Sequence, residues 1–258
     1  MMDDIVGRCE VLLAKVMQGD VAARRQMAEV FPELQDLADS GRADAQALVG
    51  GLALEYIDDV DAALRYFRMA AAADHPAGQR GLGHMLAHGI GTRQNIPEAT
   101  ELFEAAAKSG DAIAAFNLGG LLLKGTGVPP EEGRAVELLQ NALAGGVPEA
   151  AILLADWHAD RGEYAEARNF YVDAANAGST KAMLTLGKWF ADGVGGGVDK
   201  VEAVRWLLKP IDVGDGDGVH EAIQVARTMV DGEIREAAVR AGRPGDADAL
   251  ISVVRKPA

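Results

Sequence analysis

The sequence has few of the residues that build disulfides, metal cages and aromatic binding sites. Its single cysteine, Cys9, excludes an internal disulfide and a cage of thiolate ligands, and we expect a buried structural thiol. Aromatic residues make up only 5% of the chain. No long stretch alternates polar and apolar side chains, so the composition favours helices and leaves little room for a sheet.

Long apolar runs are also missing, and none approaches the ~18 residues that a membrane span needs. The first residues, MMDDIVGR, carry acids where a secretory signal carries bases. These features predict a cytoplasmic protein without membrane contact, unless a leader has been removed. The formal net charge is −14 and is spread along the chain. An acidic surface repels phosphate backbones, so we expect no nucleic-acid partner, whereas a basic protein partner would be favoured.

An alanine-led segment recurs down the middle of the chain. It begins at Ala63, Ala99, Ala135, Ala167 and Ala203, at successive spacings of 36, 36, 32 and 36 residues. A second set of similar segments lies between these, as in GLGHMLAHG from Gly81 and NLGGLLLKG from Asn117. Self-similarity at such a period is typical of a solenoid, so the sequence predicts an all-α stack of helical hairpins.

The second unit shows how each hairpin is expected to run. Helix A covers residues 76–88, a loop covers 89–95, and helix B covers 96–108. Asn95 with Glu98, and Asp199 with Glu202, predict capping boxes at the start of helix B. Glycines in the left-handed conformation are expected to end helices at positions 89, 110, 125, 178 and 193. Shorter loops are expected at 56–59 and at 160–163.

Both ends of the chain depart from the repeat. Residues 3–18 predict one amphipathic helix, and residues 20–40 resemble a degenerate repeat. After Pro210 the stretch 214–218 breaks the pattern, and helices are expected near 219–241 and 246–255. Since the ends of a solenoid must cover its last apolar faces, we interpret residues 1–42 and 213–258 as helical caps around five repeats in 43–212.

The repeat unit has the form A-x-x-x-L-G on helix A, a glycine-containing loop, and A-x-x-(aromatic or Leu) pairs on helix B. It resembles the Sel1-like repeat, a relative of the tetratricopeptide repeat, most clearly at 78–110, 114–145 and 182–197. The fourth unit departs from the pattern, with Ala155 for the usual glycine and no glycine-x-glycine loop. The resemblance implies a right-handed superhelical solenoid and a non-enzymatic, bacterial-type adaptor that binds another protein.

The repeated positions divide into small and bulky residues. One helix A position holds only small residues: Gly50, Gly83, Gly119, Ala155 and Gly187. Small residues allow two helices to approach to roughly 8 Å. Bulky helix B residues are expected to fill the space between units: Phe67, Phe103, Leu139, Tyr171 and Leu207. These positions hold the array together and do not indicate a function.

Candidate chemical sites are weak. The glycine loops lack the preceding strand and the lysine of a phosphate cradle. His84 and His88 share a helix face and could supply half a zinc site, but no third ligand lies nearby in sequence. Asp215 and Asp217 lack the glutamate of a calcium loop. Trp157 and Trp189 occupy one repeat position, which indicates packing. We therefore predict no catalytic residue, no metal and no cofactor.

The concave face, lined by helices A, is the remaining candidate. If it is arranged as in tetratricopeptide-like arrays, its residues combine apolar side chains with charges of both signs, as grooves for a peptide or helix commonly do. An ordinary solvated face is the alternative. The predicted partner-binding residues are Arg80, His84, His88, Phe116, Gly120, Lys124, Ile152, Asp156, Asp160, Leu184, Lys188 and Asp192.

The main functional hypothesis is an adaptor that binds a partner peptide or helix in this groove. One alternative is an immunity or inhibitor protein that masks a basic partner with its negative charge. Another is a regulatory subunit of an enzyme complex, or an activity in the segment after Gly214, where His220, Glu221 and Arg227 are the few candidate groups. Self-association through the end faces is a further alternative.

Overall fold

The computed structural model describes residues 5–256, and this part of the chain contains helices and turns without a strand. The chain divides into two compact units, the first ending at Gly145 and the second beginning at Gly146. The predicted all-α repeat fold is confirmed. The first unit contains α1 (Ile5–Met17), α2 (Val21–Asp39), α3 (Ala43–Leu52), α4 (Val60–Ala72), α5 (Pro76–His88), α6 (Ile96–Lys108), α7 (Ala112–Lys124) and α8 (Glu132–Ala144).

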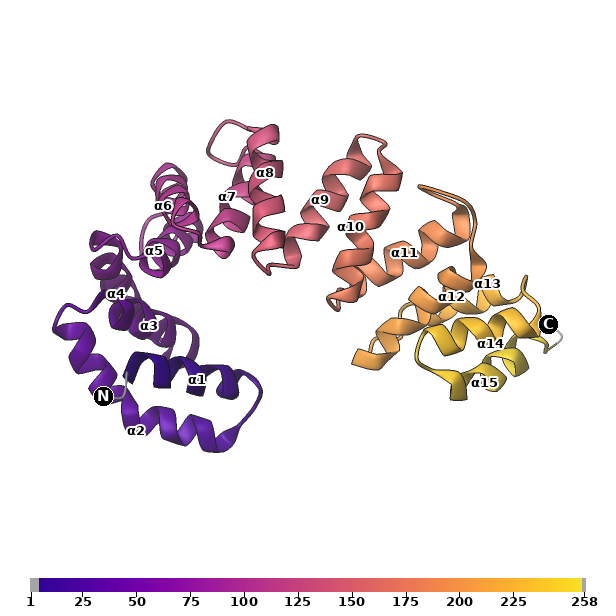
Figure 1. Ribbon diagram of the computed structural model, residues 1–258, viewed down its shortest axis with the longest axis horizontal. Coiled ribbons are helices and arrows are strands. Elements are labelled where there is room, and N and C mark those ends of the chain that lie inside the picture. Colours follow the sequence, from indigo (N-terminus) through magenta and orange to yellow (C-terminus); the bar gives the residue numbers. More distant parts are fainter. Residues whose placement is uncertain (1–4, 257–258) are drawn as a thin grey trace. The chain divides into compact units, whose positions relative to one another are not determined.

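Within the first unit each helix packs on the next one along the chain (Figure 1). The pairs α3–α4, α5–α6 and α7–α8 are the helical hairpins that the repeat predicts. Helix α3 also contacts α1 and α5, so these three helices lie side by side along one side of the unit. The bounds of α5 and α6 match the predicted ranges 76–88 and 96–108. The glycines at 89, 110, 125, 178 and 193 all have positive φ, as expected.

The small position on helix A faces the bulky position on helix B in the same hairpin. A β-carbon at Gly83 would lie 2.9 Å from Phe103 Cε1, and one at Gly119 would lie 2.8 Å from Leu139 Cγ. Phe103 and Leu139 are buried, at 2% and 0% exposure. Helix A therefore carries glycine here because the ring or isobutyl group of helix B occupies the space that a side chain would need.

Helix B begins with a hydrogen bond back to helix A. The backbone N–H of Asn95 donates to Leu86 O at 2.9 Å, and that of Asp199 donates to Phe190 O at 2.9 Å. The side chains of Asn95 and Asp199 cap their helices as predicted, accepting from the N–H groups of Glu98 and Glu202. A capping box also needs a hydrogen bond from the backbone N–H of the cap residue to the glutamate side chain, and this part of both predictions is wrong. Because the cap N–H is already bonded to helix A, Glu98 bonds the Asn95 side-chain amide instead.

The first hairpin has a tighter connection than the predicted loop at 56–59. Helix α3 continues as a π-helical turn over Ala53–Ile57, and only Asp58 and Asp59 separate it from α4. Asp58 takes the left-handed conformation with φ 60°, and the Asp59 N–H donates to Ala53 O at 2.9 Å. A π turn widens the helix by one residue, and such turns are frequent at functional sites.

The N-terminal helix α1 covers the first repeat. Ile5, Cys9, Leu12 and Val16 are buried against α2 and α3, as the predicted amphipathic helix requires. Residues 3 and 4 of the predicted range lie outside the described residues. Cys9 is fully buried, and burial raises the pKa of its thiol. The predicted buried thiol is therefore confirmed.

The second unit contains α9 (Glu149–Asp160), α10 (Tyr164–Asn176), α11 (Thr180–Asp192), α12 (Lys200–Leu208), α13 (Val219–Ala226), α14 (Asp231–Arg240) and α15 (Ala247–Val254). Short 3-10 turns cover Lys209–Val213 and Pro244–Asp246. Pro210 interrupts helix B as predicted. Residues 219–241 do not form the single expected helix, because Thr228 bonds the carbonyl of Val225 and the chain turns at 227–230. Helices α13 and α14 instead pack separately on α12.

Overpacking of the glycine position gives a direct test of this architecture. Gly119→Leu should lower the free energy of unfolding by roughly 1–3 kcal/mol, because the new side chain would overlap Leu139. Gly133→Leu is the matched control, since Gly133 lies in α8 and a β-carbon there meets no atom within 4 Å. Urea unfolding of the two variants measures the difference. Equal stabilities would contradict the assigned packing.

Candidate partner-binding groove

The A helices of the first unit line a groove with a volume of about 870 Å³. Its walls come from α1, α3, α5 and α7, together with the π turn after α3. Apolar side chains supply most of the lining. The lining residues are Glu10, Leu13, Ala14, Met17, Asp44, Ala47, Leu48, Gly51, Leu52, Leu54, Glu55, Tyr56, Phe67, His75, Ala77, Arg80, Gly81, His84, Ile90, Ile113 and Asn117.

Small residues open the groove down to an aromatic side chain. Phe67 comes from helix B of the first hairpin and reaches the groove between α3 and α5. A β-carbon at Gly81 would overlap the Phe67 ring, so α5 can lie there only with glycine. Gly51 on α3 differs, because a β-carbon there meets nothing within 4 Å. The space above Gly51 is therefore an open hollow beside Phe67.

Exposed apolar side chains border this hollow. Met17 at the end of α1 is 71% exposed, and Tyr56 in the π turn is 44% exposed. Tyrosine and methionine are typical contact residues, because tyrosine supplies a rigid amphipathic ring and methionine adapts to the shape of its partner. Tyr56 belongs to the π turn and lines the groove, so the turn supplies an aromatic residue to the rim.

The charged side chains of the groove differ in how they are paired. Arg80 Nε lies 2.9 Å from Asp111 Oδ2, and Asp44 forms an ion pair with Arg42 at 2.8 Å. The Arg42 guanidinium and other nearby groups lower the pKa of Asp44 although burial opposes the shift. Glu10 and Glu55 are exposed and form no ion pair within residues 5–256. The rim therefore carries unneutralised negative charge.

Two histidine rings of α5 lie close together in this region. The rings of His84 and His88 have centroids 4.6 Å apart and are tilted by 52°. Burial lowers the pKa of His84, and the neighbouring His88 and Arg80 add to the shift. His84 lines the groove, whereas His88 is exposed and lies one turn further along the helix. Within the described part of the chain, no three His, Cys, Asp or Glu side chains group closely enough to hold a metal ion.

The predicted binding residues of the first unit are distributed along this inner side. Arg80 and His84 line the groove. Phe116 and Gly120 are half-buried on α7, and His88 and Lys124 are exposed at the C-terminal ends of α5 and α7. Of these predicted residues, only Arg80 and His84 thus line the groove that contains the hollow beside Phe67.

In the second unit the predicted residues lie on α9 and α11. Asp156 accepts hydrogen bonds from the Tyr171 hydroxyl and from Lys181 Nζ at 3.1 Å, and burial followed by the Asp156 contact raises the pKa of Tyr171. Lys188 Nζ lies 3.7 Å from Glu221 Oε1 on α13. Ile152 is half-buried, and Asp160 and Asp192 are exposed.

Leu184 packs against the cluster formed by α12 to α15. The C-terminal helix α13 contacts α11 and so takes up part of its inner surface. Leu184 is therefore a packing contact of this unit, and Lys188 is shared with the cap.

The groove also contains residues that the sequence pattern did not single out. They come from α1, α3 and the π turn, and include Met17, Gly51 and Tyr56. Phe67 of α4 was predicted as a packing residue only. The N-terminal helix was interpreted as a cap, and a cap was not expected to supply a groove wall. A signal was nevertheless present, because Gly51 and Glu55 occupy the same repeat positions as His84 and His88.

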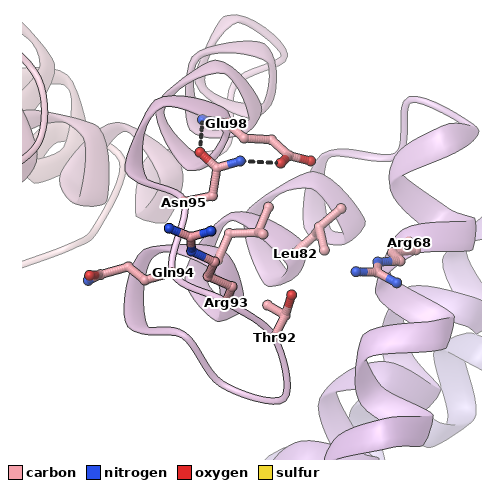
Figure 2. Close-up of a pocket in the computed structure, with 8 residues that line it drawn as sticks. Arg68, Leu82, Thr92, Arg93, Gln94, Asn95 and Glu98 are labelled. Atoms are coloured by element: carbon pink, nitrogen blue, oxygen red, sulfur yellow. Dashed lines mark hydrogen bonds between the residues drawn. The ribbon is translucent and has the colours of Figure 1, made fainter.

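A second, smaller hollow of about 440 Å³ lies between α4 and the loop that joins α5 to α6. Figure 2 shows Arg68 pointing from its helix toward Leu82 and Thr92, with Arg93 on the loop nearby. The Glu98 carboxylate there is bonded to the Asn95 amide. This hollow has a polar lining, in contrast to the groove along the A helices.

None of the helices in residues 5–256 is both long and apolar enough to cross a membrane.

Comparison with known families supports the repeat assignment. The Sel1 repeat model matches residues 43–75, 76–111, 112–147 and 180–209. The first three matches span the hairpins α3–α4, α5–α6 and α7–α8. The hairpin α9–α10 lies outside the matched residues, and it is the unit with Ala155 and the short loop.

Similar proteins come from several bacteria. A Sel1 repeat protein from Oxalobacter formigenes is 26% identical with a TM-score of 0.67, covering 77% of this chain and 60% of that one. PilF from Pseudomonas aeruginosa is 20% identical with a TM-score of 0.55, covering 86% and 97%, which shows the fold alone. An exopolysaccharide production negative regulator of Rhizobium meliloti (strain 1021) is 25% identical over 148 residues. The match covers 57% of this chain and 48% of the regulator, so the chain spans about half of that relative.

The half-buried position of His84 generates a prediction about pH. Its folded-state pKa is lowered, so in the range just below pH 6.5 the unfolded chain binds more protons than the folded one. The contribution of His84 to stability should therefore fall as the pH falls through that range. In ¹H–¹⁵N NMR titrations, the His84 ring should titrate below the value of free histidine. A pKa at or above 6.5 would contradict the burial of the ring.

Proposed function

The chain belongs to the Sel1 repeat family, and we propose that it is a non-enzymatic adaptor whose groove along the A helices binds a segment of a protein partner. Proteins built from such repeats are typically protein-interaction scaffolds. The observation that carries the proposal is the open hollow at Gly51, floored by Phe67 and bordered by exposed Met17 and Tyr56. A concave, mostly apolar site with a few polar groups is the usual form of a binding site.

The partner would contact the first unit along α3, α5 and α7. Phe67, Met17 and Tyr56 would supply apolar contact area, since a few large side chains carry most of the energy of an interface. Arg80 and His84 would lie beside the bound segment, and His88, Phe116 and Lys124 would extend the contact surface toward α7. In the second unit, Ile152, Asp156, Asp160, Lys188 and Asp192 would form a separate inner surface.

Regulation by binding is the form of adaptor activity that we propose. The Rhizobium meliloti relative is described as a negative regulator of exopolysaccharide production. A regulator of this kind can act by occupying a protein partner, which requires a binding groove and no reaction chemistry.

The proposal is tested by filling the groove without disturbing the fold. Gly51→Leu should place its side chain in the hollow, where a β-carbon meets nothing within 4 Å, and leucine favours the helix more than glycine does. We expect this variant to be at least as stable as the native chain. The partners are measured by affinity purification from the native host with quantitative mass spectrometry. The captured amount of at least one partner should be about tenfold lower for Gly51→Leu than for the native chain, the loss that corresponds to a disrupted anchor contact.

Gly133→Leu is the matched control, because it makes the same change in α8, outside the groove. It should retain the partners of the native chain. If the native chain and both variants capture the same proteins in the same amounts, binding does not use the groove and the proposed function is wrong.

A further inference from the structure

We propose that the groove of the first unit accepts a basic amphipathic helix, with one large apolar side chain inserted beside Phe67 and with lysine or arginine residues facing Glu10 and Glu55. This inference rests on the proposed function and specifies the chemistry of the partner segment. Three observations carry it: the shape of the hollow, a lining with a single side-chain amide to bind an extended backbone, and the unpaired acids on the rim.

The shape of the hollow selects a large apolar anchor. Its floor is Phe67, which is 6% exposed and packs against the backbone at Gly81. Gly51 leaves open space beside this ring, because a β-carbon there meets no atom within 4 Å. A leucine, methionine or phenylalanine side chain would bury apolar surface there, and burial of such a side chain supplies the main favourable term in association.

The lining favours a helix over an extended peptide. An extended peptide leaves its backbone N–H and C=O groups to be satisfied by the groove, whereas a helix bonds its own backbone. Asn117 is the one side-chain amide among the lining residues, and the A helices that form the walls use their own backbone groups internally. Two charged lining residues, Arg80 and Asp44, are already engaged in ion pairs. A helix lying across α3 and α5 would need only side-chain contacts from this surface.

The charge of the rim selects a basic partner. Glu10 on α1 and Glu55 on the π turn line the same groove, are exposed, and have no ion pair among residues 5–256. The positive charge of Arg80 is offset by Asp111, and Asp44 is held by Arg42. The electrostatic potential at the rim is therefore negative. The chain as a whole is also acidic, with a net charge of −14. Lysine or arginine beside the anchor would complement it and accelerate association.

The experiment uses the full chain and a defined probe. A phage library of 16-residue peptides, randomised on a helix-forming alanine background, is selected on the native protein and, in parallel, on Gly51→Leu. We expect sequences enriched only on the native protein to carry apolar residues at spacings of three and four, with a positive net charge. Circular dichroism of a synthetic peptide in the complex should show helix formation.

Charge-reversal variants then locate the basic contacts. For an enriched peptide, Glu10→Lys and Glu55→Lys should each raise the Kd by roughly fivefold at low salt, with a smaller effect at high salt because exposed charges are screened. Glu137→Lys is the matched control, because Glu137 is exposed on α8 outside the groove and the net charge changes equally. Its Kd should stay within twofold of the native value.

The outcomes separate the inference from the proposed function. Peptides that require an open Gly51 hollow but are acidic, neutral or extended would overturn the inference and leave the groove as the binding surface. Equal enrichment on the native protein and on Gly51→Leu would overturn both. A native chain that light scattering shows to be a dimer, with Gly51→Leu monomeric, would identify a second copy as the occupant and overturn the basic-helix proposal.

Discussion

The close approach of helix A to helix B within each hairpin is the constraint on which the rest of the structure depends. It requires glycine, or alanine in the fourth hairpin, at one helix A position and a bulky side chain opposite, as Gly83 with Phe103 and Gly119 with Leu139 show. The hairpin is then closed by a backbone hydrogen bond from the first residue of helix B to helix A. With these contacts satisfied inside each hairpin, the outward-facing positions of helix A are free to vary from repeat to repeat.

The groove arises from the same use of small residues. Phe67 packs against two helices, at Gly50 in its own hairpin and at Gly81 in the next one. The corresponding positions in later hairpins carry Asn117, Leu153 and Thr185 in place of Gly81, so among these hairpins a glycine at this position meets an aromatic ring only where α5 packs on α4. The side chain that packs these helices together thus also forms the floor of the groove.

Much of this architecture could be predicted because the repeat supplies the same signal several times. The bounds of α5 and α6, the left-handed glycines and the buried positions Phe103 and Leu139 all follow from residues in register. Features that occur once were harder to predict. The π turn at Ala53–Ile57 and the break at residues 227–230 depend on local hydrogen bonds without a repeat equivalent, and the groove wall from α1 depends on packing between distant segments.

The placement of the acids, more than their number, gives the charge a meaning for binding. An evenly acidic surface would attract any cation weakly, and salt would screen that attraction within about 10 Å. Glu10 and Glu55 differ from most other acids because they border a hollow that can hold an apolar anchor. A partner helix held by its anchor would keep its basic residues close to these carboxylates. Burial would then supply affinity, and the charges would select the orientation and the partner.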